Sequence, residues 1–210
     1  MTAGTEVFAQ GSSFDLRAMS IQMRNNQEEI RRYAWDSKIF YSVDGVQKII
    51  DTYSSRYNSG GFLEKMQTGN TVVNKDKVRL PNGKKLSKKE REAAYEFIRK
   101  AKEQLDNYLN PMFAEKAVRT AVATDHGEEL VLEAKDVVTN GDSVVVRLVR
   151  SSQRPLSMKV RTTIEEAPLT LEATFGSMDY GPNYTAKSIT ETSWMGLGLR
   201  IETENSNFRK

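Results

Sequence analysis

The spacing of apolar residues changes at Gly127, and this change divides the chain into two regions. Before Gly127, apolar side chains recur every three to four residues, which places them on one face of a helix. After it, apolar and polar residues alternate, as in strands with one buried and one solvated face. The pattern therefore predicts helices first and an antiparallel sheet second.

The best helical stripe follows Ser87. Ser87 and Glu90 form a capping-box pattern, in which each side chain accepts a hydrogen bond from the other residue's backbone N–H. A second helix is predicted over residues 44–58, where Asp44 can cap the first turn and apolar residues follow at helical spacing. The apolar stripes of these two helices are Ala94, Phe97, Ile98, Ala101, Leu105, Tyr108 and Leu109, and Val46, Ile49, Ile50, Tyr53 and Tyr57.

The first predicted helix carries a narrower stripe. Its apolar residues fall close to a repeat of about 3.5 residues, and its other faces are polar. So narrow a stripe suits packing along one partner helix better than burial in a broad core. We expect the stripe to form an interface with another subunit or a docked helix, through Leu16, Met19, Met23, Ile30 and Tyr33.

The sheet region contains two clear strands over residues 158–164 and 169–175, and a last strand whose Leu197, Leu199 and Ile201 share a face. Segments 129–139 and 143–149 flank a turn at Asn140-Gly141-Asp142. A two-residue turn would set Lys135 opposite Val146. A three-residue loop sets Val138 opposite Val144 and Ala134 opposite Leu148, and this register is preferred because it pairs apolar residues.

These elements predict an α+β protein, with an N-terminal helical layer of about three helices followed by a mostly antiparallel sheet of about five strands. The two helices at 44–58 and 87–109 would cover the apolar face of the sheet. The predicted regions are a flexible arm over 1–13, a helical region over 14–126 with a small basic hairpin near 72–86, a β region over 127–204, and a flexible tail over 205–210.

Positive charge is concentrated between Lys75 and Lys102. This segment holds eleven Lys and Arg against four Asp and Glu, a net charge of +7, whereas the whole chain carries +3. Such an excess can attract a polyanion, and the candidate contacts are Lys84, Lys85, Lys88 and Lys89. Beyond Lys88, however, bases and acids alternate at helical spacing, which favours a solvated helix face.

The composition excludes several kinds of chemistry. The chain has no Cys and one His, so thiol catalysis, disulfides and sites built from several imidazoles are excluded. No phosphate-binding, metalloprotease or nucleophile motif occurs, and His126 lies in a turn-like segment without a recognisable nucleophile. We therefore predict no catalytic residue, no metal and no cofactor. No segment has the pattern of a signal peptide or a membrane span, so a cytoplasmic or virion location is expected.

Three functions fit this sequence. The first is a non-enzymatic structural or assembly subunit of a larger particle, such as a viral or phage virion component. It is suggested by the 38% hydrophobic content, the narrow stripe and the absence of a catalytic site. Its partners would be copies of itself or other subunits. The alternatives are a nucleic-acid-binding accessory protein that uses segment 75–102, and a small-molecule-binding protein with a pocket between sheet and helices lined by Trp194 and Phe175.

Overall fold

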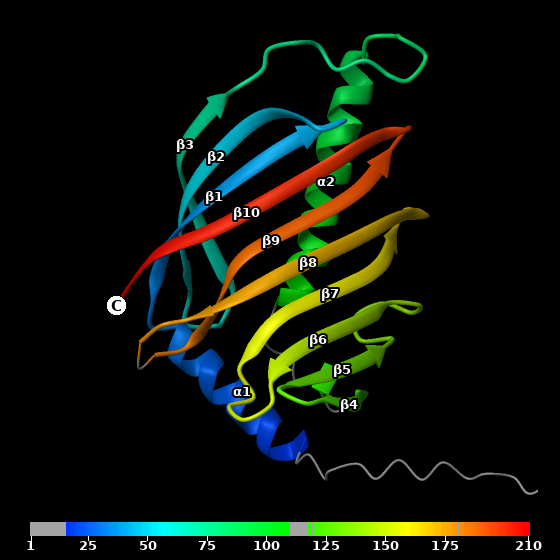
Figure 1. Ribbon diagram of the computed structural model, residues 1–210. Helices are drawn as coiled ribbons and strands as arrows, with labels where there is room; N and C mark the ends of the chain where they lie inside the picture. The colour runs from blue at the N-terminus through cyan, green and yellow to red at the C-terminus, as the bar shows by residue number, and fades with distance from the viewer. Residues whose placement is uncertain (1–15, 110–116, 119, 180) are drawn as a thin grey trace, which may run out of the picture.

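The structure is a computed structural model that describes residues 16–109, 117–118, 120–179 and 181–210. The arm predicted over residues 1–13 lies outside these ranges. Two helices are assigned in the described part of the chain, α1 (Leu16–Ile30) and α2 (Lys88–Leu109). All the assigned strands belong to one antiparallel sheet (Figure 1). The strands are β1 (Ala34–Val43), β2 (Val46–Tyr57), β3 (Leu63–Val72), β4 (Val122–His126), β5 (Glu129–Lys135), β6 (Ser143–Val149), β7 (Pro155–Ile164), β8 (Ala167–Ser177), β9 (Asn183–Trp194) and β10 (Leu197–Arg209).

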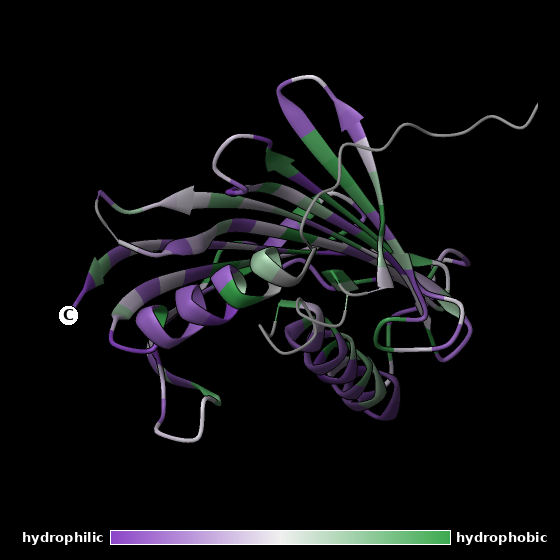
Figure 2. Cartoon of the chain, turned by 90° about the horizontal axis from the view of Figure 1, so that it is seen from below, coloured by the Kyte–Doolittle hydropathy of each residue, from purple (hydrophilic) through white to green (hydrophobic). Residues whose placement is uncertain are grey.

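The sheet combines two meanders through one long-range pairing. The strand order is β3-β2-β1-β10-β9-β8-β7-β6-β5-β4, so only the contact between β1 and β10 joins strands that are distant in the chain. Both helices lie on the same side of the curved sheet (Figure 2). A face that is apolar in β5–β8 is thereby covered by the buried side of α2 and by Met19 of α1.

The predicted α+β fold with three helices and five strands is wrong, because the sheet has ten strands and the helix predicted over residues 44–58 is replaced by strand β2. Asp44 and Gly45 have φ angles of 48° and 75° and make a two-residue turn between β1 and β2. Such left-handed angles define the tight hairpin turn for which Asp-Gly is a strong signal. Asp51 and Ser55 are buried on the inner face of β2, so the strand does not show the usual alternation of buried apolar and exposed polar residues.

The prediction for α2 is confirmed. The Ser87 N–H donates to the Glu90 carboxylate at 2.7 Å, and the Glu90 N–H donates to the Ser87 hydroxyl at 3.2 Å. Phe97, Ala101 and Leu105 are buried against the sheet. Each fully buried side chain of this kind contributes about 1.5–3 kcal/mol, although Ala contributes less.

The alternation in the sheet region is also confirmed, but the predicted register of β5 and β6 is wrong. Ala134 pairs with Val144 and Leu130 with Leu148, so the connection is longer than three residues. The side chain of Asp142 accounts for this length. Its carboxylate accepts backbone N–H bonds from Val137, Val138 and Thr139, at 2.8, 2.8 and 2.9 Å, and so stabilises a wider loop.

The chain continues as strand beyond residue 204, where the sequence predicts a flexible tail. Ser206 and Arg209 pair with Asp36 and Ala34 of β1. In the segment predicted as a basic hairpin, Arg79 forms an isolated β-bridge with Lys85.

Candidate ligand-binding cavity

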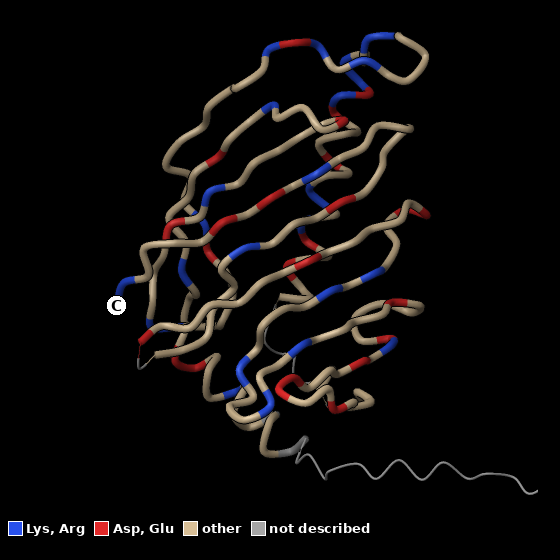
Figure 3. The backbone as a smooth tube through the Cα atoms, in the orientation of Figure 1, with Lys and Arg blue, Asp and Glu red and all other residues tan. Residues whose placement is uncertain are grey.

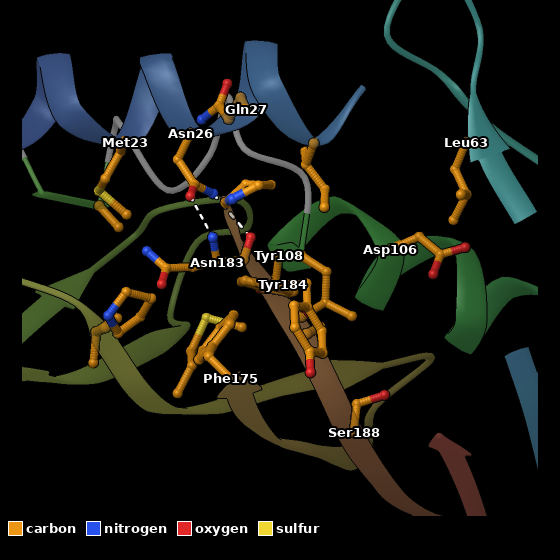
Figure 4. Close-up of a pocket in the computed structure, with 18 of the residues that line it drawn as sticks. Met23, Asn26, Gln27, Leu63, Asp106, Tyr108, Phe175, Asn183, Tyr184 and Ser188 are labelled. Atoms are coloured by element: carbon orange, nitrogen blue, oxygen red, sulfur yellow. Dashed lines mark hydrogen bonds between the residues drawn. The ribbon is translucent and has the colours of Figure 1, made fainter. Parts of the chain in front are cut away.

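A cavity of about 650 Å³ lies between the inner face of the sheet and the two helices (Figure 4). This is within the range of roughly 300–1,000 Å³ typical of small-molecule sites. Both helices and strands from both meanders contribute to its wall. One part of the wall is apolar and the other is polar.

The apolar part is formed where α1 faces strands β5–β8. The side chains that line it include Met19, Met23, Leu132, Val146, Met158 and Phe175. Most of these residues are strand residues whose neighbours along the chain point to the outer face. Because apolar and polar residues alternate along these strands, one face of each strand is apolar, and these apolar faces form this part of the cavity wall.

Two amide hydrogen bonds hold α1 against the start of β9. The Asn26 side chain donates to the Asn183 carbonyl at 3.0 Å and accepts from the Asn183 N–H at 2.6 Å (Figure 4). Because both backbone groups of Asn183 are satisfied by one side chain, the helix is fixed in position along the strand as well as across it.

Four aromatic rings form one end of the cavity. Trp35 lies 5.4 Å from Tyr57 and 5.6 Å from Phe208, and Phe208 lies 4.2 Å from Tyr184, all measured between ring centroids. The four residues all line the cavity. They come from β1, β2, β9 and β10, so the rings pack across the junction between the two meanders.

The inner face of β1 and β2 also carries buried polar side chains, of which Ser37 lines the cavity. The carboxylate of Asp51 accepts hydrogen bonds from the side chains of Asn70 at 2.5 Å, Gln67 at 3.2 Å and Tyr53 at 3.2 Å. Burial, followed by the negative charge of nearby Asp51, raises the pKa of Tyr53, so its phenol stays protonated as a donor. A second buried contact joins the hydroxyls of Ser37 and Ser55 at 2.9 Å.

Two lysines reach the cavity wall on this polar side. Lys65 of β3 lies 3.9 Å from Asp106 of α2, and the Lys102 ammonium lies 5.7 Å from the Tyr53 ring centroid. Burial, and then the positive charge of Lys65, lowers the pKa of Lys102, while Asp106 and Asp51 act in the opposite direction. Lys102 is therefore a partly desolvated cation beside the Lys65–Asp106 ion pair.

The candidate interface residues lie in several environments. Met19 and Ile30 are 1% and 7% exposed within the single chain, and Met23 and Tyr33 are half-buried. Met23 lines the cavity, whereas Leu16 begins α1 and its side chain is outside the described set. The stripe thus includes three residues of the cavity wall, Met19, Met23 and Ile30.

The candidate polyanion contacts Lys84, Lys85, Lys88 and Lys89 are exposed. Lys84 and Lys85 belong to the segment between β3 and α2, at the top of Figure 3, and Lys88 and Lys89 form the start of α2; none of the four lines the cavity.

Of the two predicted pocket residues, Phe175 lines the cavity and Trp194 packs against the hydrophobic core. His126 is exposed at the end of β4. Among the residues that the structure describes, no group of three or more His, Asp or Glu side chains could hold a metal ion. Within the same residues, no helix is both long enough and apolar enough to cross a bilayer.

Sequence reasoning missed the polar cavity residues Ser37, Lys65 and Lys102, and it missed the polar inner face of β2 formed by Asp51, Tyr53 and Ser55. The signal that could have revealed part of it is the Asp44-Gly45 pair, which marks a hairpin and hence a strand through Asp51. In that strand, Asp51, Tyr53 and Ser55 share one face.

No protein family and no curated protein sequence matches the chain. Three solved structures are similar over about nine-tenths of its length. A LolA superfamily protein from Nitrosomonas europaea has 13% identity and a TM-score of 0.44, covering 90% of this chain and 92% of its own. A DUF1329 family protein from Desulfovibrio piger has 10% identity and a TM-score of 0.45, covering 92% and 91%. MucB, in complex with MucA(peri), has 8% identity and a TM-score of 0.24, covering 91% and 94%.

The prediction of a virion subunit is wrong. The apolar residues Met19 and Ile30, whose stripe had suggested assembly, are buried in the chain's own fold, and a ligand-sized cavity lies beside them. The predicted alternative of a pocket between sheet and helices agrees better with this arrangement.

Proposed function

We propose that the protein is a non-enzymatic binding protein for a small amphipathic molecule, which it holds in the cavity between the sheet and the helices. The observation that carries this proposal is the divided wall of the cavity. Apolar side chains such as Leu132 and Phe175 would bury the apolar part of the ligand, and polar side chains that line the cavity, such as Ser37, Lys65 and Lys102, would contact its polar end.

The size of the cavity supports a ligand rather than a packing defect. Protein interiors are packed to the density of organic crystals and contain few voids larger than a water molecule. A space of about 650 Å³ beside Met23 and Val146 is far larger, and leaving it empty would forfeit the van der Waals contacts of its lining. A bound molecule restores those contacts.

A pair of variants on one strand tests the proposal. Val146 points into the cavity, whereas its neighbour Val145 lies on the outer face of β6. Val146→Trp should fill the cavity and reduce the binding of a neutral fluorescent apolar probe such as N-phenyl-1-naphthylamine by at least tenfold. Val145→Trp should leave binding unchanged. Overpacking at Val146 should cost about 1–3 kcal/mol, so thermal unfolding is recorded for both variants.

Native mass spectrometry of the purified protein gives a second readout. We expect a bound small molecule in the wild type that is absent from the Val146→Trp variant. If the folded Val146→Trp variant binds the probe as tightly as the wild type does, the cavity is not the binding site and the proposed function fails.

A further inference from the structure

The Lys102 side chain lacks an acceptor for its charge. Among the described residues, its ammonium makes no hydrogen bond or ion pair, and its specific contact is with the face of the Tyr53 ring. The residue is half-buried on the side of α2 that faces β2, and it lines the cavity. A partly buried ammonium with three unused donors is costly unless an acceptor is supplied.

The nearby carboxylates do not meet this need. Asp51 is already hydrogen-bonded by Asn70, Gln67 and Tyr53. Asp106 lies 3.9 Å from Lys65, and its side chain is 46% exposed to solvent. Among the described residues, neither carboxylate therefore forms an ion pair with Lys102.

The phenol hydroxyl of Tyr57 is a further hydrogen-bond donor at this part of the cavity. Tyr57 lines the cavity, and burial, then the charge of Asp106, raises the pKa of its phenol. The phenol therefore remains an O–H donor at neutral pH. Arg31 lies near enough to Tyr57 to oppose this shift, so it adds a further positive charge on this side.

We propose that the polar end of the cavity is a subsite for an anionic headgroup, a carboxylate or a phosphate, bound by Lys102 and Lys65. This inference rests on the proposed function and specifies its ligand as an anionic amphiphile. An anion between the two ammonium groups removes their mutual repulsion and accepts their hydrogen bonds. The apolar chain of the same molecule continues toward Met23 and Phe175, because one cavity joins both regions.

Matched probes that differ only in the headgroup test this subsite. Palmitate, hexadecyl phosphate and hexadecanol are titrated against wild-type protein by displacement of a fluorescent apolar probe. At least one of the two anions should bind ten or more times more tightly than the neutral alcohol. Comparison of palmitate with hexadecyl phosphate shows which headgroup the subsite prefers.

Variants then assign the preference to residues. Lys102→Met should weaken binding of the preferred anion about tenfold while leaving hexadecanol binding unchanged, which also shows that the variant is folded. Lys102→Arg keeps the charge and should retain the preference. The control is Lys89→Met, on the exposed first turn of the same helix, which should change neither affinity.

The outcomes separate the two proposals. If the alcohol binds as tightly as both anions, or if Lys102→Met weakens the alcohol and the anion equally, the headgroup subsite is overturned and the binding function stands. If none of the three amphiphiles binds wild-type protein, both proposals fall.

Discussion

Asp142 shows how one side chain can set the geometry of a loop and the position of a helix. It is 1% exposed, and besides its three backbone contacts it accepts a hydrogen bond from the Tyr108 hydroxyl of α2 at 2.7 Å. Burial acts to raise the pKa of the carboxyl, but the hydrogen bonds from Thr139, Tyr108 and Val137 outweigh it and hold the pKa below its ordinary value. The charged form is therefore the one that stabilises the fold.

Replacing this carboxylate should expose its contribution directly. Asp142→Asn should lower the free energy of unfolding by about 2–4 kcal/mol at pH 7, because an amide N–H₂ then faces backbone donors. A depressed folded-state pKa gives stabilisation that is present above about pH 4 and lost as the pH falls through the folded value. Urea unfolding at pH 7 and pH 3 should therefore show a smaller deficit at the lower pH.

The matched control for this variant is Glu133→Gln, an exposed carboxylate on β5, which should change stability by less than about 0.5 kcal/mol. A deficit in Asp142→Asn that is the same size at both pH values would contradict the role of the charge.

At the scale of elements, the sequence predicts α1, α2 and the apolar strands, and it fails at β1–β3. The difference has one cause. In β7 and β8 the inner face packs against α2 and needs apolar residues, so the period of 2 is visible. In β2 the inner face carries Asp51 and Ser55, so apolar and polar residues do not alternate as in β7 and β8, and the spacing of Val46 and Ile50 also fits a helix. The apolar wall could therefore be predicted, whereas the polar wall could not.

The docking of α1 should depend on Asn26. Asn26→Ala removes both hydrogen bonds to Asn183 and leaves that backbone N–H and carbonyl without partners, which costs about 1–2 kcal/mol. We expect amide hydrogen exchange in α1 to become roughly five- to thirtyfold faster, as measured by mass spectrometry.

Exchange in α2 should stay unchanged in this variant. The control is Asn25→Ala, on the exposed side of α1. Equal acceleration in both helices would indicate global destabilisation instead of local release of α1.

At the scale of the whole molecule, the pairing of β1 with β10 unites the two meanders. Beyond residue 204 this pairing includes the ring of Phe208, which lies 5.6 Å from Trp35, and an ion pair between Arg209 and Asp36 at 2.9 Å. The end of β10 thus holds the aromatic end of the cavity in place. Apolar patterning alone could not predict this segment, because its only large apolar residue is Phe208.

Deleting residues 205–210 tests this role. The loss of Phe208 packing alone should cost about 3 kcal/mol, and a domain of this size loses about 2–4 °C per kcal/mol, so the unfolding temperature should fall by about 6–12 °C. Removing only Lys210 is the control and should have little effect. An unchanged unfolding temperature after the full deletion would show that residues 205–210 behave as the predicted flexible tail.

The β1–β10 pairing also determines when the sheet can be completed while the chain is being synthesised. Among the described strands, β1–β3 join the rest of the sheet only through β10, which is made last. At roughly 5–20 residues per second, the interval between Val72 and Leu197 lasts about 6–25 s. During that time β1–β3 are in water without their final neighbour. Polar side chains on the inner face of β2, such as Asp51 and Ser55, make the waiting strands less prone to aggregate than a fully apolar face would.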